Sequence, residues 1–255
     1  VTAGEVMART FAVWRRVGSS CRGALVWFLR DLWAGAGWGL LDETGVPKPC
    51  FRMLSRALQP IHLSISDDAL NGLHVHVTNE HAEPLPGQLE VKAYRNGEIA
   101  VAHGFKALVV PPRGAERVSV VGLLDGFMDL SCAYRFGPAE HDVVVATLRG
   151  LDGMLLAQAF HWVGGWNLQR SADLGLEAHA RMLGDGVGEV TVRTRAMAIA
   201  VHFETDTHTP DDDYFHLAPG AEHTVRLNPC QVAKPLSGRV AAVNAAVSAP
   251  IRLAM

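Results

Sequence analysis

The chain has 255 residues, of which 49% are hydrophobic and 19% are charged, and its formal net charge is -3. This composition is typical of a globular protein with enough apolar side chains for one to three domains, and it excludes a disordered tail. The slightly acidic balance supplies no positive field for a polyanion. We therefore expect neither nucleic acid nor an anionic membrane as a partner.

The most apolar stretch, residues 23–41, contains Arg30 and Asp31 at its centre, so it does not predict a membrane span. No basic segment followed by an apolar run opens the chain, so no signal peptide is visible and the compartment, cytoplasm or periplasm, stays open. The cysteines are far apart and form no CxxC pair, which predicts buried free thiols rather than a zinc site or a disulfide framework. They are Cys21, Cys50, Cys132 and Cys230.

Residues 1–59 have the pattern of an α/β segment. Apolar residues recur at helical spacing between Thr2 and Gly18, and Thr2 with Glu5 has the form of a capping box. The continuous apolar run Ala24–Leu29 is typical of a strand buried on both faces, as in parallel sheets. A glycine-rich loop at 33–39 and a turn at 42–45 follow. Prolines at 47 and 49 then introduce a second helix.

From residue 61 onward the hydrophobic period changes from helical to alternating. Leu73, Val75 and Val77 alternate with His74, His76 and Thr78, which predicts a half-buried strand with its polar side in water. Further strands are predicted at 88–94, 106–110, 117–121, 129–136, 142–148 and 154–162, separated by turn signals such as Asn96-Gly97. This spacing of short strands predicts an immunoglobulin-like sandwich over residues 60–164.

A second set of alternating segments follows Gly164-Gly165. Strands are predicted at 174–182, 189–195, 198–204, 214–217, 223–227 and 238–246. We interpret residues 165–255 as a second, smaller sandwich.

Two ordered motifs about 180 residues apart carry a resemblance to a known family. Residues 23–33 read GALVWFLRDLW and residues 37–49 read GWGLLDETGVPKP, which resembles the eighth barrel strand, loop and helix of glycoside hydrolase family two. Residues 213–220, DYFHLAPG, resemble a signature of the terminal sandwich of β-mannosidases in that family. The chain thus resembles the C-terminal portion of such an enzyme.

The resemblance implies a fold that is mainly β with an α/β segment. The last helix, strand and helix of a (β/α)₈ barrel, residues 1–59, would precede two immunoglobulin-like β-sandwiches. It also implies a retaining exo-glycosidase that removes terminal β-linked mannose from mannosides, manno-oligosaccharides or glycoproteins. Such an enzyme needs two carboxyl groups about 5 to 5.5 Å apart.

The family places both catalytic glutamates earlier in the barrel than the part that this chain resembles. We therefore expect no catalytic residue in this chain and no activity from it alone. The expected partners are the N-terminal portion of the enzyme and a mannoside bound by the complete barrel. No cofactor and no metal site is expected.

Four residues are candidates for contact with, or support of, a sugar site. The family has a tryptophan at the position of Trp27 that forms an apolar wall beneath the sugar, and an aromatic plane suits the CH face of a pyranose. Trp33 is expected to line the same pocket, with Trp38 a weaker candidate. Asp31 is a lone carboxylate near the strand end, so a loop-anchoring role behind the substrate-contacting residues is expected.

Other constellations have simpler structural explanations. His74 and His76 leave the same face of a strand and could share a metal, but a polar sandwich face explains them as well. Asp211, Asp212 and Asp213 lack the ligand spacing of a calcium loop. Two further tryptophans, Trp162 and Trp166, could stack on sugar, although packing is the simpler explanation.

A non-catalytic sandwich protein that binds carbohydrate or a protein partner is the alternative interpretation. The two hypotheses differ in how residues 1–59 are covered. A barrel remnant exposes apolar surface around Trp27, whereas an independent protein folds that segment back and covers it.

Overall fold

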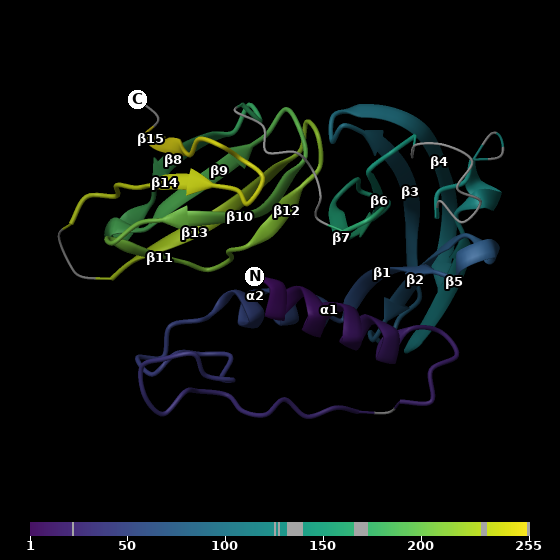
Figure 1. The fold of residues 1–255 in the computed structure, drawn as a ribbon, viewed down its shortest axis with the longest axis horizontal. Coiled ribbons are helices and arrows are strands. Elements are labelled where there is room, and N and C mark those ends of the chain that lie inside the picture. Colours follow the sequence, from purple (N-terminus) through teal and green to yellow (C-terminus); the bar gives the residue numbers. More distant parts are fainter. Residues whose placement is uncertain are drawn as a thin grey trace. The chain divides into compact units, whose positions relative to one another are not determined.

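The computed structural model describes residues 1–21, 23–124, 126, 128–131, 140–165, 173–230 and 234–253. The chain forms two compact units, Thr2–Asn167 and Leu168–Met255, the second including Val1 (Figure 1). The predicted division at 59/60 and 164/165 stays a proposal. In the part of the chain that the structure describes, no helix is long and apolar enough to cross a membrane.

The first unit begins with two packed helices, α1 (Thr2–Arg15) and α2 (Pro49–Ala57). Both were predicted by the spacing of their apolar residues, and α2 begins at a proline as expected. Their shared cluster contains Leu40, Leu54 and Ala57. A Cβ at Gly4 would lie 2.7 Å from the sulfur of Met53, so this glycine permits the close approach of the helices.

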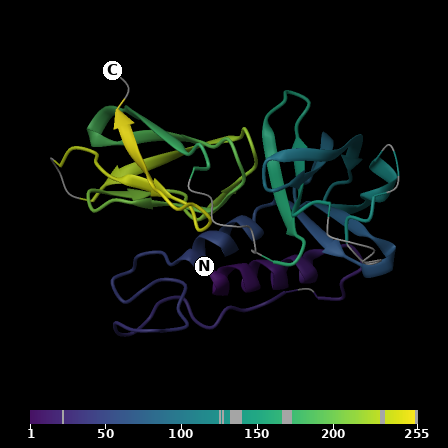
Figure 2. The same cartoon turned by 45° about the horizontal axis from the view of Figure 1, so that its top comes forward.

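The predicted buried strand at 24–29 is not formed. These residues belong to a long connection that runs from α1 to α2 (Figure 2), and the described residues of this connection form no regular strand. Leu25 is fully exposed. A strand buried on both faces needs hydrogen-bonded neighbours at both edges, and the nearest pairing to this segment is the isolated bridge between Arg30 and Leu41. The continuous apolar run at 24–29 predicts a buried strand only where neighbouring strands are present to pair with it, and the described chain does not supply them.

The rest of the first unit is a sandwich of antiparallel sheets around one core. One sheet has the order β1-β2-β5 and the other β4-β3-β6-β7. Side chains of both sheets share a buried cluster that includes Val75, Leu89 and Ala146. The strands are β1 (Ile61–Asp67), β2 (Leu73–Asn79), β3 (Leu85–Arg95), β4 (Ile99–Val110), β5 (Gly114–Ser119), β6 (Val143–Arg149) and β7 (Leu155–Trp162), with short helices η1 (Ala69–Asn71) and η2 (Val121–Leu123).

The polar face of β2 is largely covered, contrary to the prediction: His74 and Thr78 are half-buried and His76 is buried. His76 is only 3% exposed, because residues at the end of α1 cover that face of the sheet. Alternation correctly identified the strand, but the sequence did not show that a helix covers its second face.

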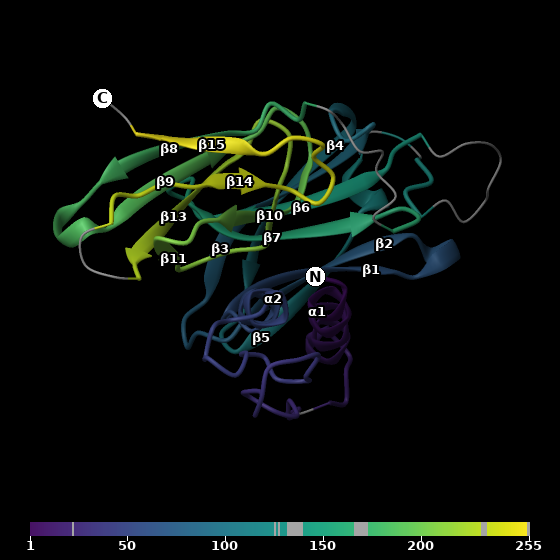
Figure 3. The same ribbon diagram turned by 60° about the vertical axis from the view of Figure 1, so that its left-hand side comes forward.

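The second unit contains a continuous sheet with the order β11-β13-β9-β8-β15-β14-β10-β12 (Figure 3). Its strands curl around one cluster that includes Val190, Phe203 and Leu227. Strand β15 pairs with β8 in parallel, and the other pairs are antiparallel. The elements are β8 (Glu177–Met182), η3 (Gly184–Gly186), β9 (Gly188–Arg193), β10 (Ala198–Glu204), β11 (His208–Pro210), β12 (Phe215–Leu217), β13 (Glu222–Pro229), β14 (Arg239–Ala241) and β15 (Ala249–Leu253).

Most strands predicted from alternation are confirmed, but their ends differ. The strand predicted at 106–110 begins already at Ile99, and the one predicted at 238–246 ends at Ala241. Strands β1, β11 and β15 were missed. Two of them, β11 and β15, have at most five residues and include a proline, so they carry little alternation. The strand predicted at 129–136 lies mostly outside the described residues. The coarse prediction of a mainly β protein whose described α-helices lie in its first 59 residues is confirmed, whereas the barrel-end segment and the two immunoglobulin-like sandwiches stay predictions.

Candidate functional site

The predicted sugar-contacting residues lie in the connection between α1 and α2. Three tryptophan rings stand out from it: Trp27 is 78% exposed, Trp33 74% and Trp38 77%. Leu25 and Leu32 are also exposed. The Trp27–Phe28 peptide bond is cis, and the rings of these two residues meet edge to face at 6.2 Å. The segment therefore presents large aromatic planes that the rest of the described chain leaves uncovered.

Asp31 is the buried anchor of this exposed segment. It is 5% exposed and accepts a hydrogen bond of 2.7 Å from the backbone N–H of Gly39. Its other carboxylate oxygen forms an ion pair with Lys48, whose ammonium also donates to the carbonyl of Gly37 at 3.3 Å. Asp31 thus ties together the two ends of the glycine-rich loop and the start of α2.

The charge state of Asp31 follows from these contacts. The hydrogen bond from Lys48, reinforced by the N–H of Gly39, holds the pKa of the Asp31 carboxyl below its usual value despite burial. The carboxylate is ionised at neutral pH and its charge is balanced within the loop. Such a group holds structure well, but it is a poor proton donor.

The turn at 42–46 supports the loop from the other side. Asp42 accepts hydrogen bonds from the N–H of Thr44 at 2.9 Å and of Val46 at 2.8 Å. The hydroxyl of Thr44 also donates to it at 2.7 Å, and these bonds lower the pKa of Asp42. Asp42 is therefore a turn-stabilising acid, as its position between the glycine-rich loop and α2 suggested.

Sequence reasoning named Asp31 but not its partners. Lys48 was visible only as part of a family motif, and Gly37 and Gly39 only as members of a glycine-rich loop. A buried carboxylate predicts a cation nearby. No local spacing rule identifies which lysine or arginine supplies that charge from 17 residues away.

The remaining candidates take ordinary structural roles. His74 lies 3.1 Å from Asp68 and His76 lies 2.9 Å from the hydroxyl of Ser66. Trp162 is buried and stacks on Phe160 at 6.0 Å, while its predicted companion Trp166 lies outside the described residues.

The aspartates at 211–213 serve the turn that contains them. Asp213 accepts hydrogen bonds from the N–H groups of Phe203 and Tyr214. Asp212 lies 3.1 Å from His223, and Asp211 accepts from the N–H of Arg226. Within the described ranges, no group of three or more His, Cys, Asp or Glu residues is arranged to hold a metal ion.

Comparison with known proteins identifies relatives for most of the chain. No family model matches it. Beta-mannosidase B from Emericella nidulans and Beta-mannosidase B from Aspergillus niger are each 24% identical to it, over 253 and 246 aligned residues. Each match covers 89% of this chain and 28% of the relative. The chain is similar in sequence to proteins named β-mannosidase. It spans less than a third of the length of these relatives.

Solved structures of glycosidases share the fold of this chain. A β-D-mannosidase from Dictyoglomus thermophilum has a TM-score of 0.75 and 13% sequence identity. The match covers 99% of this chain and 29% of the mannosidase chain. An exo-chitosanase from Amycolatopsis orientalis matches 97% of this chain and 34% of its own, with a TM-score of 0.73 and 18% identity. The resemblance to a portion of family-two β-mannosidases is therefore confirmed, and the shared fold is consistent with a C-terminal portion.

Proposed function

We propose that this chain is the C-terminal part of a retaining exo-glycosidase that hydrolyses terminal β-linked mannose. The observation that carries the proposal is the exposed aromatic segment around Trp27, held in place by the buried Asp31 and its ion pair with Lys48. The relationship to proteins named β-mannosidases supplies the reaction. The other portion of the same enzyme would supply both catalytic carboxylates and cover the apolar part of the segment.

In this proposal Trp27 and Trp33 form apolar walls of the sugar subsite. Their exposed rings have the size and chemistry to pack against the CH face of a pyranose. Asp31 acts behind them, because its hydrogen bond and ion pair fix the loop that bears Trp33. This positioning role needs an ionised, internally paired carboxylate, and Asp31 is one.

The exposure of the segment also favours this proposal over the non-catalytic alternative. A self-sufficient sandwich protein would cover the apolar residues near its start, yet Leu25, Trp27 and Leu32 are each more than three-quarters exposed. Apolar surface of this kind marks a site that another part of a protein covers.

Steady-state kinetics of the complete enzyme that contains this chain test the proposal. With an aryl β-D-mannoside as substrate, we expect Trp27→Ala to lower kcat/KM by about tenfold or more, because the lost stacking contribution is on the order of 1.5 kcal/mol. Trp27→Phe keeps an aromatic plane and should retain more activity than Trp27→Ala. Leu70→Ala, an exposed apolar residue outside the segment, is the control and should leave kcat/KM unchanged.

The isolated 255-residue chain provides the second arm. We expect no hydrolysis of the aryl mannoside by this chain alone. Turnover that is lost on Asp31→Asn would refute the assignment of the catalytic carboxylates to another portion of the enzyme. Equal kcat/KM for Trp27→Ala and the parent enzyme would refute the proposed subsite.

A further inference from the structure

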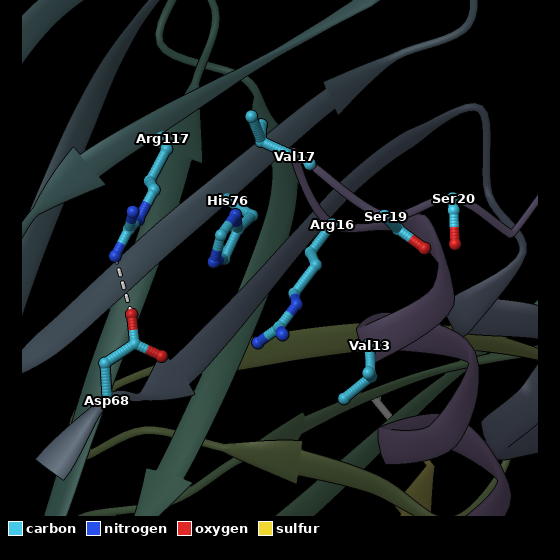
Figure 4. A pocket seen from close by; sticks show the side chains of 9 residues that line it. Val13, Arg16, Val17, Ser19, Ser20, Asp68, His76 and Arg117 are labelled. Atoms are coloured by element: carbon cyan, nitrogen blue, oxygen red, sulfur yellow. Dashed lines mark hydrogen bonds and ion pairs between the residues drawn. The ribbon is translucent and has the colours of Figure 1, made fainter.

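A polar cavity of about 380 Å³ lies in the first unit, where the end of α1 meets β2 and β5 (Figure 4), and no tryptophan is among its described lining residues. A volume of this size lies in the range of small-molecule sites. Its polar lining comes from sequence-distant elements: Arg16, Ser19, Ser20, Asp68, His76 and Arg117.

The charges in this cavity do not cancel. Arg117 forms an ion pair of 2.6 Å with Asp68, so these two charges offset each other. Arg16 is exposed and forms no ion pair within the described ranges. Figure 4 shows its guanidinium beside His76, on the side opposite to Arg117. One positive charge is left over, and a monoanion would neutralise it.

His76 forms the floor of the cavity without adding charge. It is 3% exposed, its Nε2 lies 2.9 Å from the hydroxyl of Ser66, and its Nδ1 has no hydrogen-bond partner within the described residues. Burial, aided by the two arginines, lowers the pKa of His76 to about 4, so the ring is neutral at pH 7. The neutral ring gives the cavity a polar floor but adds no positive charge, so Arg16 is the group that attracts the anion.

The end of α1 shapes the remaining wall. Gly18 adopts φ of +83°, a conformation that favours glycine, and the chain reverses there. The N–H of Ser19 donates to the carbonyl of Arg16 at 3.2 Å, which closes the helix end. The reversal places Ser19 and Ser20 in the cavity lining beside Arg16.

We propose that this cavity binds a small hydroxylated carboxylate of about monosaccharide size, such as a sugar acid. Arg16 holds the carboxylate, since a guanidinium offers paired donors that match a carboxylate. Asp68 and the serine hydroxyls accept from and donate to the ligand hydroxyl groups. The site is independent of the tryptophan segment and of the proposed hydrolase activity.

Calorimetric titration of the 255-residue chain with D-glucuronate tests this site, with D-glucose as the neutral counterpart. We expect glucuronate to bind at least about fivefold more tightly than glucose and to bind more weakly as the salt concentration rises. Arg16→Gln should weaken glucuronate binding at least about fivefold. The matched control is Arg9→Gln on the same helix, where Arg9 is paired with Glu5, and it should bind as the parent does.

Arg16→Gln breaks no ion pair, so the variant should fold, and its thermal unfolding midpoint verifies this. Ser20→Asp supplies a second test, because a carboxylate placed in the lining should repel the ligand and abolish binding. Equal affinities for glucuronate and glucose, or for the Arg16 and Arg9 variants, would overturn the proposal. Tighter binding of inorganic phosphate than of glucuronate would overturn the assignment to a hydroxylated carboxylate.

Discussion

Gly39 shows how closely the glycine-rich loop wraps around one carboxylate. A Cβ at this position would lie 2.6 Å from both the backbone nitrogen and Oδ1 of Asp31. The backbone of Asp31 cannot move away, because its N–H donates to the carbonyl of Leu41 at 3.1 Å. The lack of a side chain at position 39 therefore permits the hydrogen bond that anchors the loop.

Gly39→Ala should lower the free energy of unfolding by about 1 to 3 kcal/mol, the cost of forcing an extra carbon into a packed site. Chemical denaturation measures the effect. Gly23→Ala is the control, since a Cβ there meets nothing within 4 Å, and its effect should stay within about 0.5 kcal/mol. Equal stability of the two variants would contradict the packing argument.

His76 links burial to the pH dependence of stability. Its folded-state pKa of about 4 lies below the unfolded value of 6.5. Above pH 6.5 both states are neutral and the full stability is present. As the pH falls from 6.5 to 4, the unfolded state binds the proton first, so stability declines by up to about 3 kcal/mol.

Denaturation midpoints measured between pH 4 and pH 8 test this dependence. His62, whose pKa burial also lowers to about 4, should contribute in the same direction. His76→Gln should make the stability profile flatter between pH 6.5 and 4. Dependence in the same direction should remain, because burial also lowers the pKa of His62, His141 and His161. An unchanged slope in the variant would show that His76 does not cause the decline.

At the scale of elements, one buried amide ties the C-terminal part of the second unit to the start of strand β10. Asn244 is 5% exposed. Its Oδ1 accepts from the N–H of Ile199 at 2.8 Å, and its Nδ2 donates to the carbonyl of Met197 at 2.7 Å. The turn between β14 and β15 is thereby joined to the start of β10. Alternation along the strands carries no sign of this connection.

Asn244→Ala should destabilise the chain by about 2 to 4 kcal/mol, because it leaves two buried backbone groups without partners. Urea denaturation followed by circular dichroism measures the loss. Asn228→Ala on the exposed side of β13 is the matched control and should cost less than about 0.5 kcal/mol. A loss of similar size in both variants would argue against the role of the buried amide.

At the scale of the whole molecule, the exposed apolar segment between α1 and α2 should make the isolated chain associate. Leu25 and Leu32 are 100% and 80% exposed beside three exposed tryptophan rings, and uncovered apolar surface of this extent promotes self-association. The double variant Leu25→Lys, Leu32→Lys should raise the dissociation constant for self-association at least about tenfold. Sedimentation analysis over a range of concentrations measures it.

The control for this experiment is Leu70→Lys, which also replaces a strongly exposed leucine by a lysine but lies outside the segment. It should leave self-association unchanged. Monomeric behaviour of the parent chain at all concentrations would contradict the prediction and weaken the proposal that another portion of the enzyme covers this surface.

The sequence by itself determined the features that depend on neighbours in the chain. Helical spacing identified α1 and α2, alternation identified most strands, and two ordered motifs identified the relationship to β-mannosidases. These signals are local, because a strand or helix must place its apolar side chains on one face whatever lies opposite.

Only the tertiary structure decided what lies opposite each face. It buried His76 beneath the end of α1, left Leu25 and Trp27 exposed, and paired Asp31 with Lys48. An apolar run predicts that a segment is buried, but the residues that bury it come from distant parts of the chain or from another chain. Burial, charge pairing and the cavity at Arg16 therefore followed from the fold and not from any single stretch of sequence.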